Sequence, residues 1–415
     1  MEKEKQKEHM KIVIVGHVDH GKSTLIGRLL YDTSSLPDGF IEEIKKTCEM
    51  LGRELEFAYV LDSLEEEREQ NITIDTTQTF FKTKKREYVI IDAPGHKEFV
   101  KNMITGASLA EAAILIVSAK EGVQEQTKRH AYILSMLGIK QVIVAVNKID
   151  LIGYKEEIFN SVKGELLKFL DSVKIKPSYV IPISAKEGDN IAKKSEKIRW
   201  YSSLTVLEAL DAFETEKKAA NKPLRLPVQD VYKIDDKRII AGRIESGKIK
   251  KGDNIIFLPS NKETIVKSIE AFNENREDAE AGESIGITTE EELFIERGQV
   301  ICHKDRLPKV KDRFKANIFW MSDKQFDINE KITIKCATQE AECFIEKIEK
   351  RINSSDLEVI EENAKKLEHT ELGSVIIKTK GPLVIENFND MAELGRCVFV
   401  KGYDTVAGGI ITEND

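Results

Sequence analysis

A glycine-bounded loop between an apolar stretch and a helical pattern contains residues suited to binding a phosphate chain. The apolar stretch covers 12–15, the helical pattern covers 25–30, and the loop between them reads G-x-x-x-x-G-K-S. The glycines allow backbone N–H groups to approach phosphate oxygens, and the following helix adds unpaired N–H groups and its positive dipole end. Lys22 can neutralise the β- and γ-phosphates, and the Ser23 hydroxyl can coordinate Mg²⁺. The predicted phosphate-binding residues are Gly16, His17, Val18, Asp19, His20, Gly21, Lys22, Ser23 and Thr24.

A second loop, D-A-P-G-H, follows the apolar stretch 88–91. Its strand-terminal aspartate, Asp92, is placed to hold a metal-bound water. The backbone N–H of Gly95 can contact a γ-phosphate and move away once that phosphate leaves. His96, the next residue, can position the attacking water, so His96 is the predicted catalytic residue.

Two further loops predict a site for guanine. In the N-K-x-D sequence at 147–150, the Asp150 carboxylate can accept from N1–H and the exocyclic amine of guanine, a pairing that adenine cannot make. The stem of Lys148 is expected to lie over the base, and Asn147 is expected to tie this loop to the phosphate loop. At Ser184-Ala185-Lys186 a backbone amide can meet guanine O6. The predicted ligands are therefore GTP and GDP, with Mg²⁺ as the cofactor.

These loops must lie at one edge of a sheet if they are to act on one nucleotide. The stretches 113–117, 141–146 and 179–183 are continuously apolar, as expected for parallel strands covered on both faces. The stretch 80–91 is typical of a hairpin with a charged turn. Each loop follows the carboxyl end of a strand, where open α/β sheets bind ligands. The first half is therefore predicted to be an α/β P-loop G domain with a mostly parallel, doubly wound sheet.

The motifs GHVDHGKS, ITID, DAPGH, NKID and SAK resemble those of the translation-factor class of GTPases. This resemblance implies that Val18 and Ile72 form a hydrophobic gate that keeps the catalytic His96 off the water at rest. It also implies that Thr73 is a switch residue on Mg²⁺, together with Ser23, although the I-T-I sequence alone also fits an edge strand. Asn71 stands where the family usually has glycine, which restricts φ and leaves its effect on switching open.

Composition bounds the class of protein. The 415 residues carry a net charge of −8 and 33% charged side chains, which argues against non-specific binding to nucleic acid or anionic membranes but not against a shaped RNA. The five cysteines are scattered and lack C-x-x-C spacing, so we expect idle thiols in a reducing cytosol. No apolar run approaches the roughly 18 residues of a membrane span, and 1–10 lack the apolar core of a signal peptide. We therefore expect a soluble cytoplasmic protein with a disordered tail at 1–10.

From Phe213 to Pro223 the chain is charged and helical, and it breaks at Asn221-Lys222-Pro223. Beyond this break the second half changes to short strands with turn signals at Ser246-Gly247 and Gly252-Asp253. A second break at Leu307-Pro308 opens another such set. Evenly spaced strands of this kind predict closed barrels or sandwiches. The expected divisions are the G domain at 11–215, a linker at 216–223, and two all-β barrel domains at 224–307 and 308–415.

A G domain with two trailing barrels is shared by the tRNA-delivering elongation factors and the GTPase subunit of bacterial sulfate adenylyltransferase. Local details here resemble the latter: Q-T-K-R-H at 126–130, L-P-S at 258–260 and T-V-A-G-G-I-I at 405–411. Ala337-Thr338 and the stretch 397–402 depart from its pattern. The same matches also fit barrel packing and turn chemistry that all such domains share.

The closer resemblance implies a GTPase subunit that couples GTP hydrolysis to formation of adenylyl sulfate and pyrophosphate from ATP and sulfate. A separate small adenylyltransferase subunit would carry out the transfer, because no second nucleotide loop follows residue 200. The rival interpretation is an elongation-factor-like GTPase that binds aminoacyl-tRNA, whose barrels would show a basic groove with aromatic side chains. A third is a regulator of another adenylyltransferase-like enzyme. The partner, the trigger of hydrolysis and the oligomeric state stay open.

Overall fold

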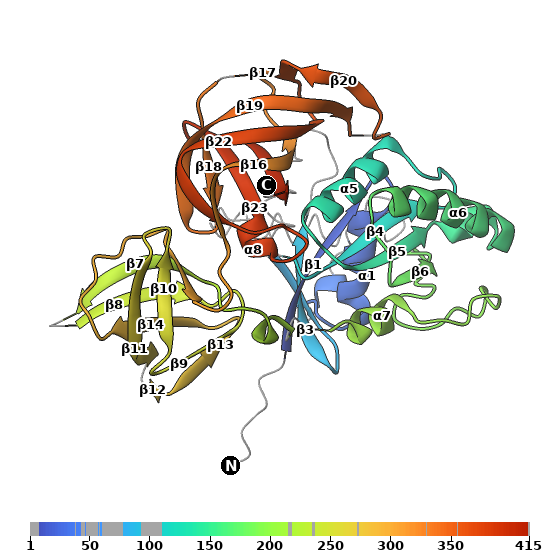
Figure 1. Ribbon diagram of the computed structural model, residues 1–415. Coiled ribbons are helices and arrows are strands. Elements are labelled where there is room, and N and C mark those ends of the chain that lie inside the picture. Colours follow the sequence, from blue (N-terminus) through green and yellow to red (C-terminus); the bar gives the residue numbers. More distant parts are fainter. Residues whose placement is uncertain are drawn as a thin grey trace, which may run out of the picture. The chain divides into compact units, whose positions relative to one another are not determined.

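The computed structural model describes residues 8–37, 39–42, 46, 57, 59, 78–92, 110–214, 218–234, 237–271, 274–328, 330–354 and 356–413. The chain forms two compact units, 1–215 and 216–415 (Figure 1). None of the helices in the described ranges has the length and apolar character needed to cross a membrane.

The first unit is built on a six-stranded sheet with the order β2-β3-β1-β4-β5-β6. Its strands are β1 (Glu8–Gly16), β2 (Gln78–Lys82), β3 (Arg86–Asp92), β4 (Ala112–Ser118), β5 (Gln141–Asn147) and β6 (Tyr179–Pro182). Neighbouring strands run parallel except β2 and β3, which form the predicted hairpin. Every residue of β4 is buried, as expected for a central strand covered on both faces.

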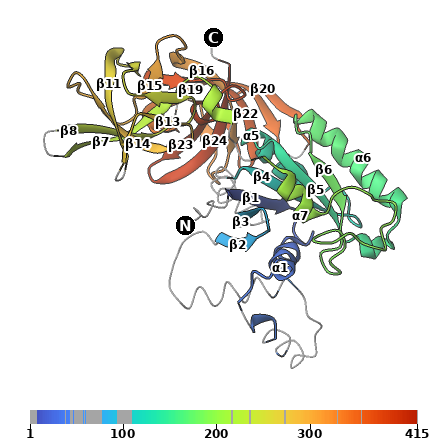
Figure 2. The same cartoon turned by 90° about the horizontal axis from the view of Figure 1, so that it is seen from below.

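Helices cover both faces of this sheet, so the first unit is doubly wound. Helices of this unit within the described residues include α1 (Lys22–Asp32), α5 (Glu125–Met136), α6 (Glu156–Ser172), α7 (Val206–Ala212) and the 3-10 helix η2 (Ile149–Ile152). Met10, Ile12 and Ile14 of β1 pack into one apolar core with α1 and α7. Helix α5 packs on β1 and β4, and Figure 2 shows α1 and α5 on opposite sides of the sheet.

Strand β1 begins earlier than the sequence suggested. The disordered tail was expected to reach residue 10, but Glu8, His9 and Met10 pair in parallel with β3. Met10 is fully buried, whereas His9 and Lys11 on either side are exposed. A single buried methionine among charged residues supplies the core contact, and this is too short an alternation to be recognised as a strand.

The second unit contains two barrels. The first is a seven-stranded sheet, β10-β15-β7-β8-β14-β11-β12, that closes on itself because β10 also pairs with β11. Its strands are β7 (Leu226–Ile234), β8 (Lys237–Arg243), β10 (Asn254–Leu258), β11 (Lys262–Ala271), β12 (Glu274–Arg276), β14 (Ser284–Thr289) and β15 (Val300–His303). A small sheet of β9 (Lys248–Lys250) and β13 (Asp278–Glu280) is added to it.

The other barrel has the order β18-β23-β24-β16-β22-β19-β20 and closes through β18 and β19. Its strands are β16 (Lys309–Trp320), β18 (Ile332–Cys336), β19 (Gln339–Asn353), β20 (Val359–Ala364), β22 (Glu371–Ile385), β23 (Arg396–Lys401) and β24 (Asp404–Glu413). The remaining elements are β17 (Phe326–Asp327), β21 (Lys366–Leu367) and the short helix α8 (Ala392–Gly395). The fold is thus a P-loop G domain followed by two all-β barrels; 224–307 and 308–415 stay the proposed extents of the barrels.

The segment expected to be a linker is packed against the barrels. A 3-10 helix, η3, covers Lys218–Asn221, and the carbonyl oxygen of Ala219 accepts a 2.8 Å hydrogen bond from the Gly247 N–H. Lys222 Nζ donates to the Asp390 carbonyl oxygen at 3.0 Å, which connects this segment to the other barrel. Between the two barrels, Arg225 Nη2 lies 2.6 Å from Glu386 Oε1. These bonds join the second unit into one body.

Candidate functional site

The loop between β1 and α1 is a tight turn in which two positions require glycine. A Cβ on Gly16 would lie 2.4 Å from the Ile116 carbonyl oxygen, and a Cβ on Gly21 would lie 2.4 Å from Asn147 Nδ2. Gly21 also has a φ of 95°, and Asp19 within the loop has a φ of 62°. Both ends of the loop are thus fixed by close contact with neighbouring segments, which gives a preformed backbone cradle of the kind that phosphates occupy.

The mouth of this loop has a positive electrostatic character. Lys22 Nζ donates to the carbonyl oxygens of Gly16 at 3.0 Å and His17 at 3.1 Å. Helix α1 begins at Lys22 and has no acidic residue in its first turn, so its dipole is not neutralised there. Ser23 and Thr24 lie half-buried in the same turn. This arrangement fits a Mg²⁺-bound phosphate chain, and Ser23 supplies the hydroxyl that we propose as a metal ligand.

Asn147 links three loops at the carboxyl ends of the strands. Its Nδ2 donates to the His20 carbonyl oxygen at 2.8 Å, and its Oδ1 accepts from the Ala185 N–H at 2.9 Å. The side chain is buried, so neither bond competes with water. The phosphate loop, the N-K-x-D loop and the S-A-K loop are therefore held together by one amide.

The remaining base-site residues lie around this link. Lys148 has a left-handed φ of 62°, and its Nζ lies 3.2 Å from an oxygen of Glu121. Asp150 is half-buried in η2, and Ser184 and Ala185 are buried after β6. Lys186 is exposed. Asp150 therefore retains access to a base, as the proposed guanine contact requires.

Replacing Asn147 by alanine tests the role of this link. Both partners would be left without their hydrogen bonds in a buried place, at a cost of about 1–3 kcal/mol for each. We expect the Asn147→Ala variant to unfold at a lower temperature in calorimetry and to release GDP at least tenfold faster. Asn160→Ala, at an exposed position of α6, is the matched control. Equal GDP release by the two variants would refute the linking role.

Four predicted site residues lie outside the described residues: Ile72, Thr73, Gly95 and His96. Asp92 ends β3, where its backbone pairs with Ile14 beside the phosphate loop. The switch, gate and catalytic roles of these residues therefore rest on the sequence motifs alone and stay predictions.

Two residues of α5 support the phosphate loop, although no binding role was predicted for them. Gln126 Oε1 accepts from the Val18 N–H at 3.4 Å. His130 is buried, and burial, reinforced by the Lys22 ammonium, lowers the pKa of its imidazole to about 3. Both belong to the Q-T-K-R-H sequence, which was read only as a family marker. The polar residues of this sequence, within an otherwise helical pattern, were the only feature that could have indicated a role in the site.

The buried imidazoles predict sensitivity to acid. Burial lowers the pKa of His20 to about 4 and that of His130 to about 3, whereas an unfolded histidine has a pKa of about 6.5. Between these values the unfolded chain binds more protons than the folded one, so stability decreases as the pH falls below about 6.5. We expect the unfolding temperature to decrease from pH 7 to pH 5, and to decrease less in His130→Asn. An identical slope for both proteins would contradict this account.

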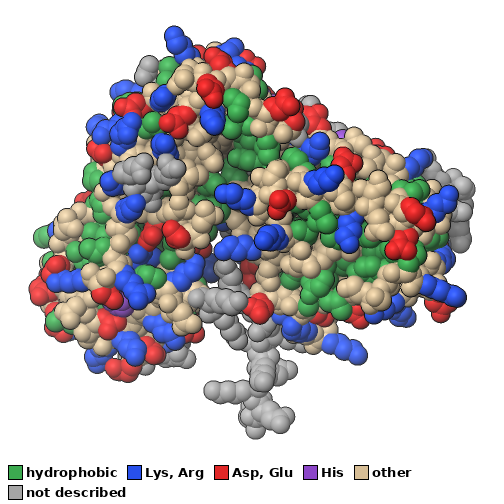
Figure 3. Space-filling view, turned by 45° about the vertical axis from the view of Figure 1, so that its right-hand side comes forward, with side chains coloured by type: hydrophobic (Ala, Val, Ile, Leu, Met, Phe, Trp, Pro, Cys, Tyr) green, Lys and Arg blue, Asp and Glu red, His purple; other side chains and the backbone are tan. Residues whose placement is uncertain are grey.

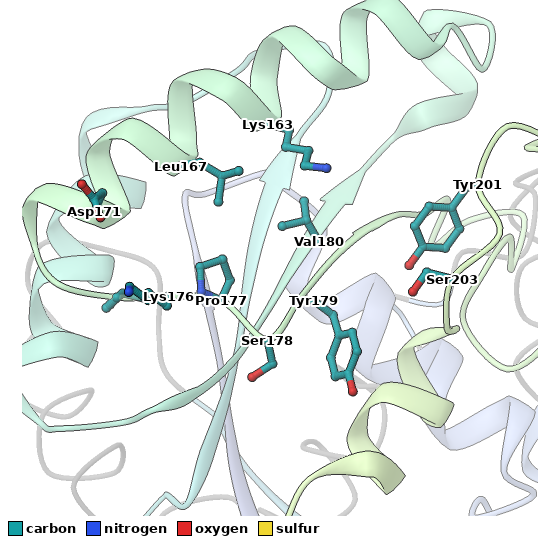
Figure 4. A pocket seen from close by; sticks show the side chains of 11 residues that line it. Lys163, Leu167, Asp171, Lys176, Pro177, Ser178, Tyr179, Val180, Tyr201 and Ser203 are labelled. Atoms are coloured by element: carbon teal, nitrogen blue, oxygen red, sulfur yellow. The ribbon is translucent and has the colours of Figure 1, made fainter.

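A separate pocket of about 510 Å³ lies between α6, the start of β6 and the segment 201–203 (Figure 4). Lys163, Val180 and Tyr201 are among the side chains that line it. It adjoins the amino end of β6, whereas Ser184 follows the carboxyl end of that strand. The pocket therefore does not belong to the nucleotide site.

Models of known protein families match the chain along its length. The elongation factor Tu GTP binding domain matches 7–216, elongation factor Tu domain 2 matches 237–302, and the GTP-eEF1A C-terminal domain-like family matches 313–412. Their order agrees with a G domain followed by two barrels.

Full-length relatives are similar as well. Elongation factor 1-alpha of Pyrococcus horikoshii is 40% identical over 420 residues, which cover 98% of this chain and 98% of the relative. The protein of the same name from Thermoplasma acidophilum is 42% identical over 413 residues, with 97% of each chain covered. That of Methanothermobacter thermautotrophicus is 42% identical over 412 residues, with 98% of each covered.

The prediction of a sulfate adenylyltransferase GTPase subunit with a small adenylyltransferase partner is therefore wrong, since these relatives are elongation factors. The T-V-A-G-G-I-I residues behind it serve the barrel fold. Val406, Ala407 and Ile411 are buried in the core, and a Cβ on Gly409 would lie 2.8 Å from the Ile318 side chain. Such packing requirements are shared by barrels of different function.

Proposed function

Since this chain belongs to the elongation factor Tu and elongation factor 1-alpha family of GTPases, we propose that it carries aminoacyl-tRNA in its GTP state and releases it after hydrolysis. As a member of this family it binds GTP and GDP with Mg²⁺. The observation that carries the proposal is 40–42% identity to proteins named elongation factor 1-alpha over nearly the whole length. Its partners would be aminoacyl-tRNA and the ribosome, which places its action in the cytoplasm.

Within the nucleotide site we assign one role to each group of residues. Asp150 recognises guanine, Lys22 contacts the β- and γ-phosphates, and Ser23 and Thr73 hold Mg²⁺, which stabilises negative charge on the phosphate oxygens. His96 positions the attacking water. The γ-phosphate orders the segments around Thr73 and Gly95, and aminoacyl-tRNA must bind this ordered state more tightly than the GDP state.

The β7–β8 hairpin and the segment beside it offer a surface for the single-stranded end of a tRNA. Tyr232 is 50% exposed and Phe294 is 78% exposed. The Arg238 guanidinium lies 4.9 Å from the centre of the Phe294 ring, and Lys233 is exposed on the same hairpin. Exposed rings stack on bases, and arginine planes add cation–π attraction. Lys233 pairs with Arg238 across the hairpin and lies on the same face, whereas Tyr232 pairs with Ile239 on the opposite face. We define Lys233, Arg238 and Phe294 as the hairpin surface.

Aromatic contacts matter here because positive charge is not concentrated on the face that Figure 3 shows. On the face shown in Figure 3, basic and acidic side chains are interspersed. The net charge of −8 also opposes attraction of a polyanion. Recognition of tRNA would therefore depend on shape and stacking more than on a continuous basic patch.

Removing the Phe294 ring from the hairpin surface should weaken tRNA binding without affecting the nucleotide. Base–aromatic stacking contributes about 1–3 kcal/mol per base, so Phe294→Ala should weaken aminoacyl-tRNA binding about tenfold. GTP affinity should not change. Tyr403→Ala, at the fully exposed turn between β23 and β24, is the matched control. A similar loss in the control, or none in Phe294→Ala, would reject this surface.

Spontaneous deacylation of aminoacyl-tRNA tests the proposed function. A carrier shields the ester bond, so the purified chain with a non-hydrolysable GTP analogue should slow deacylation, and with GDP it should not. Lys22→Ala should give no protection, because it lacks the contact to the phosphates. Deacylation at the same rate with either nucleotide would contradict the proposal.

A further inference from the structure

The loop that follows β4 lies between the two parts of the nucleotide site. In the sheet, β4 stands between β1, which leads into the phosphate loop, and β5, which leads into the N-K-x-D loop (Figure 1). Glu121 belongs to this middle loop. No local motif marks it, because its position depends on the strand order rather than on its sequence neighbours.

Glu121 contacts residues of both neighbouring loops. One carboxylate oxygen lies 3.2 Å from Lys148 Nζ, and the other lies 3.7 Å from His20 Nε2. His20 is fully buried, so this contact reaches an inward-facing side chain of the phosphate loop.

The backbone around Glu121 is held in place. The Glu121 N–H donates to Ser118 Oγ at 3.2 Å, and Gln124 Nε2 donates to the Glu121 carbonyl oxygen at 2.7 Å. The Ala119 N–H donates to the Asn147 carbonyl oxygen at 2.7 Å. The carboxylate is therefore presented from a fixed loop, and a fixed carboxylate can determine where a flexible lysine lies.

The charges around this carboxylate favour its ionised form. Burial alone would raise the pKa of Glu121, but its hydrogen bond and attraction to Lys148, with contributions from Ser118 and His20, lower it. The ring of His20 is neutral near pH 7, because burial lowers its pKa to about 4. The Glu121 carboxylate and the Ile116 carbonyl raise this pKa, whereas His17 and Lys148 lower it, so burial decides the outcome. Glu121 thus meets one positive charge, that of Lys148, and one neutral imidazole.

We propose that Glu121 is a positioning residue for the guanine nucleotide, which holds the Lys148 side chain over the base and connects the base site to the phosphate loop through His20. The lysine stem has several rotatable bonds, and fixing its ammonium removes much of that freedom before the nucleotide binds. Without the carboxylate, the stem must be ordered by the nucleotide itself. This inference concerns GTP and GDP binding and stands apart from the proposed delivery of aminoacyl-tRNA.

The first test compares Glu121→Gln with Glu187→Gln. Glu187 is an exposed glutamate next to the S-A-K loop that pairs with Lys197, so its replacement changes the net charge near the site equally. Glu121→Gln should release fluorescent GDP about fivefold faster, as expected for loss of a partly exposed ion pair, and Glu187→Gln should not. Single-turnover hydrolysis at saturating GTP should be unchanged in Glu187→Gln. Equal release rates in the two variants would overturn the proposal.

The second test asks whether Glu121 acts through Lys148. In the Lys148→Met background, which keeps the stem and removes the ammonium, Glu121→Gln should no longer accelerate GDP release. Added sodium chloride should reduce the effect in the original background, because it screens the partly exposed pair. Unfolding temperatures of all variants identify any general loss of folding. Additive effects of the two substitutions would overturn the positioning role.

Discussion

Replacing Asp150 by asparagine is expected to change the nucleotide preference from GTP to xanthosine triphosphate. In the proposed contact the carboxylate accepts from both N1–H and the 2-amino group of guanine. The asparagine amide keeps an acceptor oxygen for N1–H but presents an N–H donor that clashes with the 2-amino group and suits the 2-oxo group of xanthine. The lost bond and the unpaired donors, at about 1–3 kcal/mol each, should weaken GTP binding by about 10²-fold or more. Binding of fluorescent GTP and xanthosine triphosphate to both proteins measures the exchange of preference.

Asp171→Asn, at an exposed position at the end of α6, is the control and should bind GTP normally. The half-buried position of Asp150 after β5 supports the assignment, because it leaves the carboxylate accessible beside the linked loops. If the unmodified protein bound ATP and GTP equally well, the guanine assignment would be lost.

Hydrolysis should depend on His96 and binding should not. In His96→Ala, loss of the group proposed to orient the attacking water should slow single-turnover hydrolysis by about 10²-fold or more, with GTP affinity near normal. The measurement is GTP cleavage with the activating partner present, which for a translation factor is the ribosome.

His9→Ala is the matched histidine control, since His9 is exposed in β1. Its Nδ1 lies 3.5 Å from Glu87 Oε2, away from the nucleotide site. Unchanged hydrolysis in His96→Ala would move the catalytic role to another residue. A large loss of GTP affinity would instead assign His96 to binding.

The loops of the nucleotide site could be predicted from sequence because each combines a local motif with a preceding apolar strand. The link between Asn147 and the phosphate loop is present as a hydrogen bond to His20. Gln126, His130 and Glu121 were not predicted as site residues. Their roles arise from which strands and helices lie next to one another, and this order is set by packing rather than by spacing along the chain.

The barrels were predicted as a fold, but their function was misread. Strand alternation and turn residues are dictated by closure of the sheet, and residues such as Gly409 and Ile411 satisfy that requirement in any barrel of this shape. The packing of the helical segment around Lys218–Asn221 was not foreseen, because the residues that bond it, Gly247 and Asp390, are distant in sequence. Function is carried by exposed side chains, for which the barrel pattern gives no signal.

The most direct test of the proposed function is the affinity of the full chain for a fluorescent aminoacyl-tRNA in each nucleotide state. With a non-hydrolysable GTP analogue and Mg²⁺, we expect tight binding. With GDP, or with deacylated tRNA, binding should be at least about 10²-fold weaker, since a carrier must release its cargo after hydrolysis. Equal affinity in the GTP and GDP states, or no binding in either, would contradict a GTP-controlled carrier of aminoacyl-tRNA.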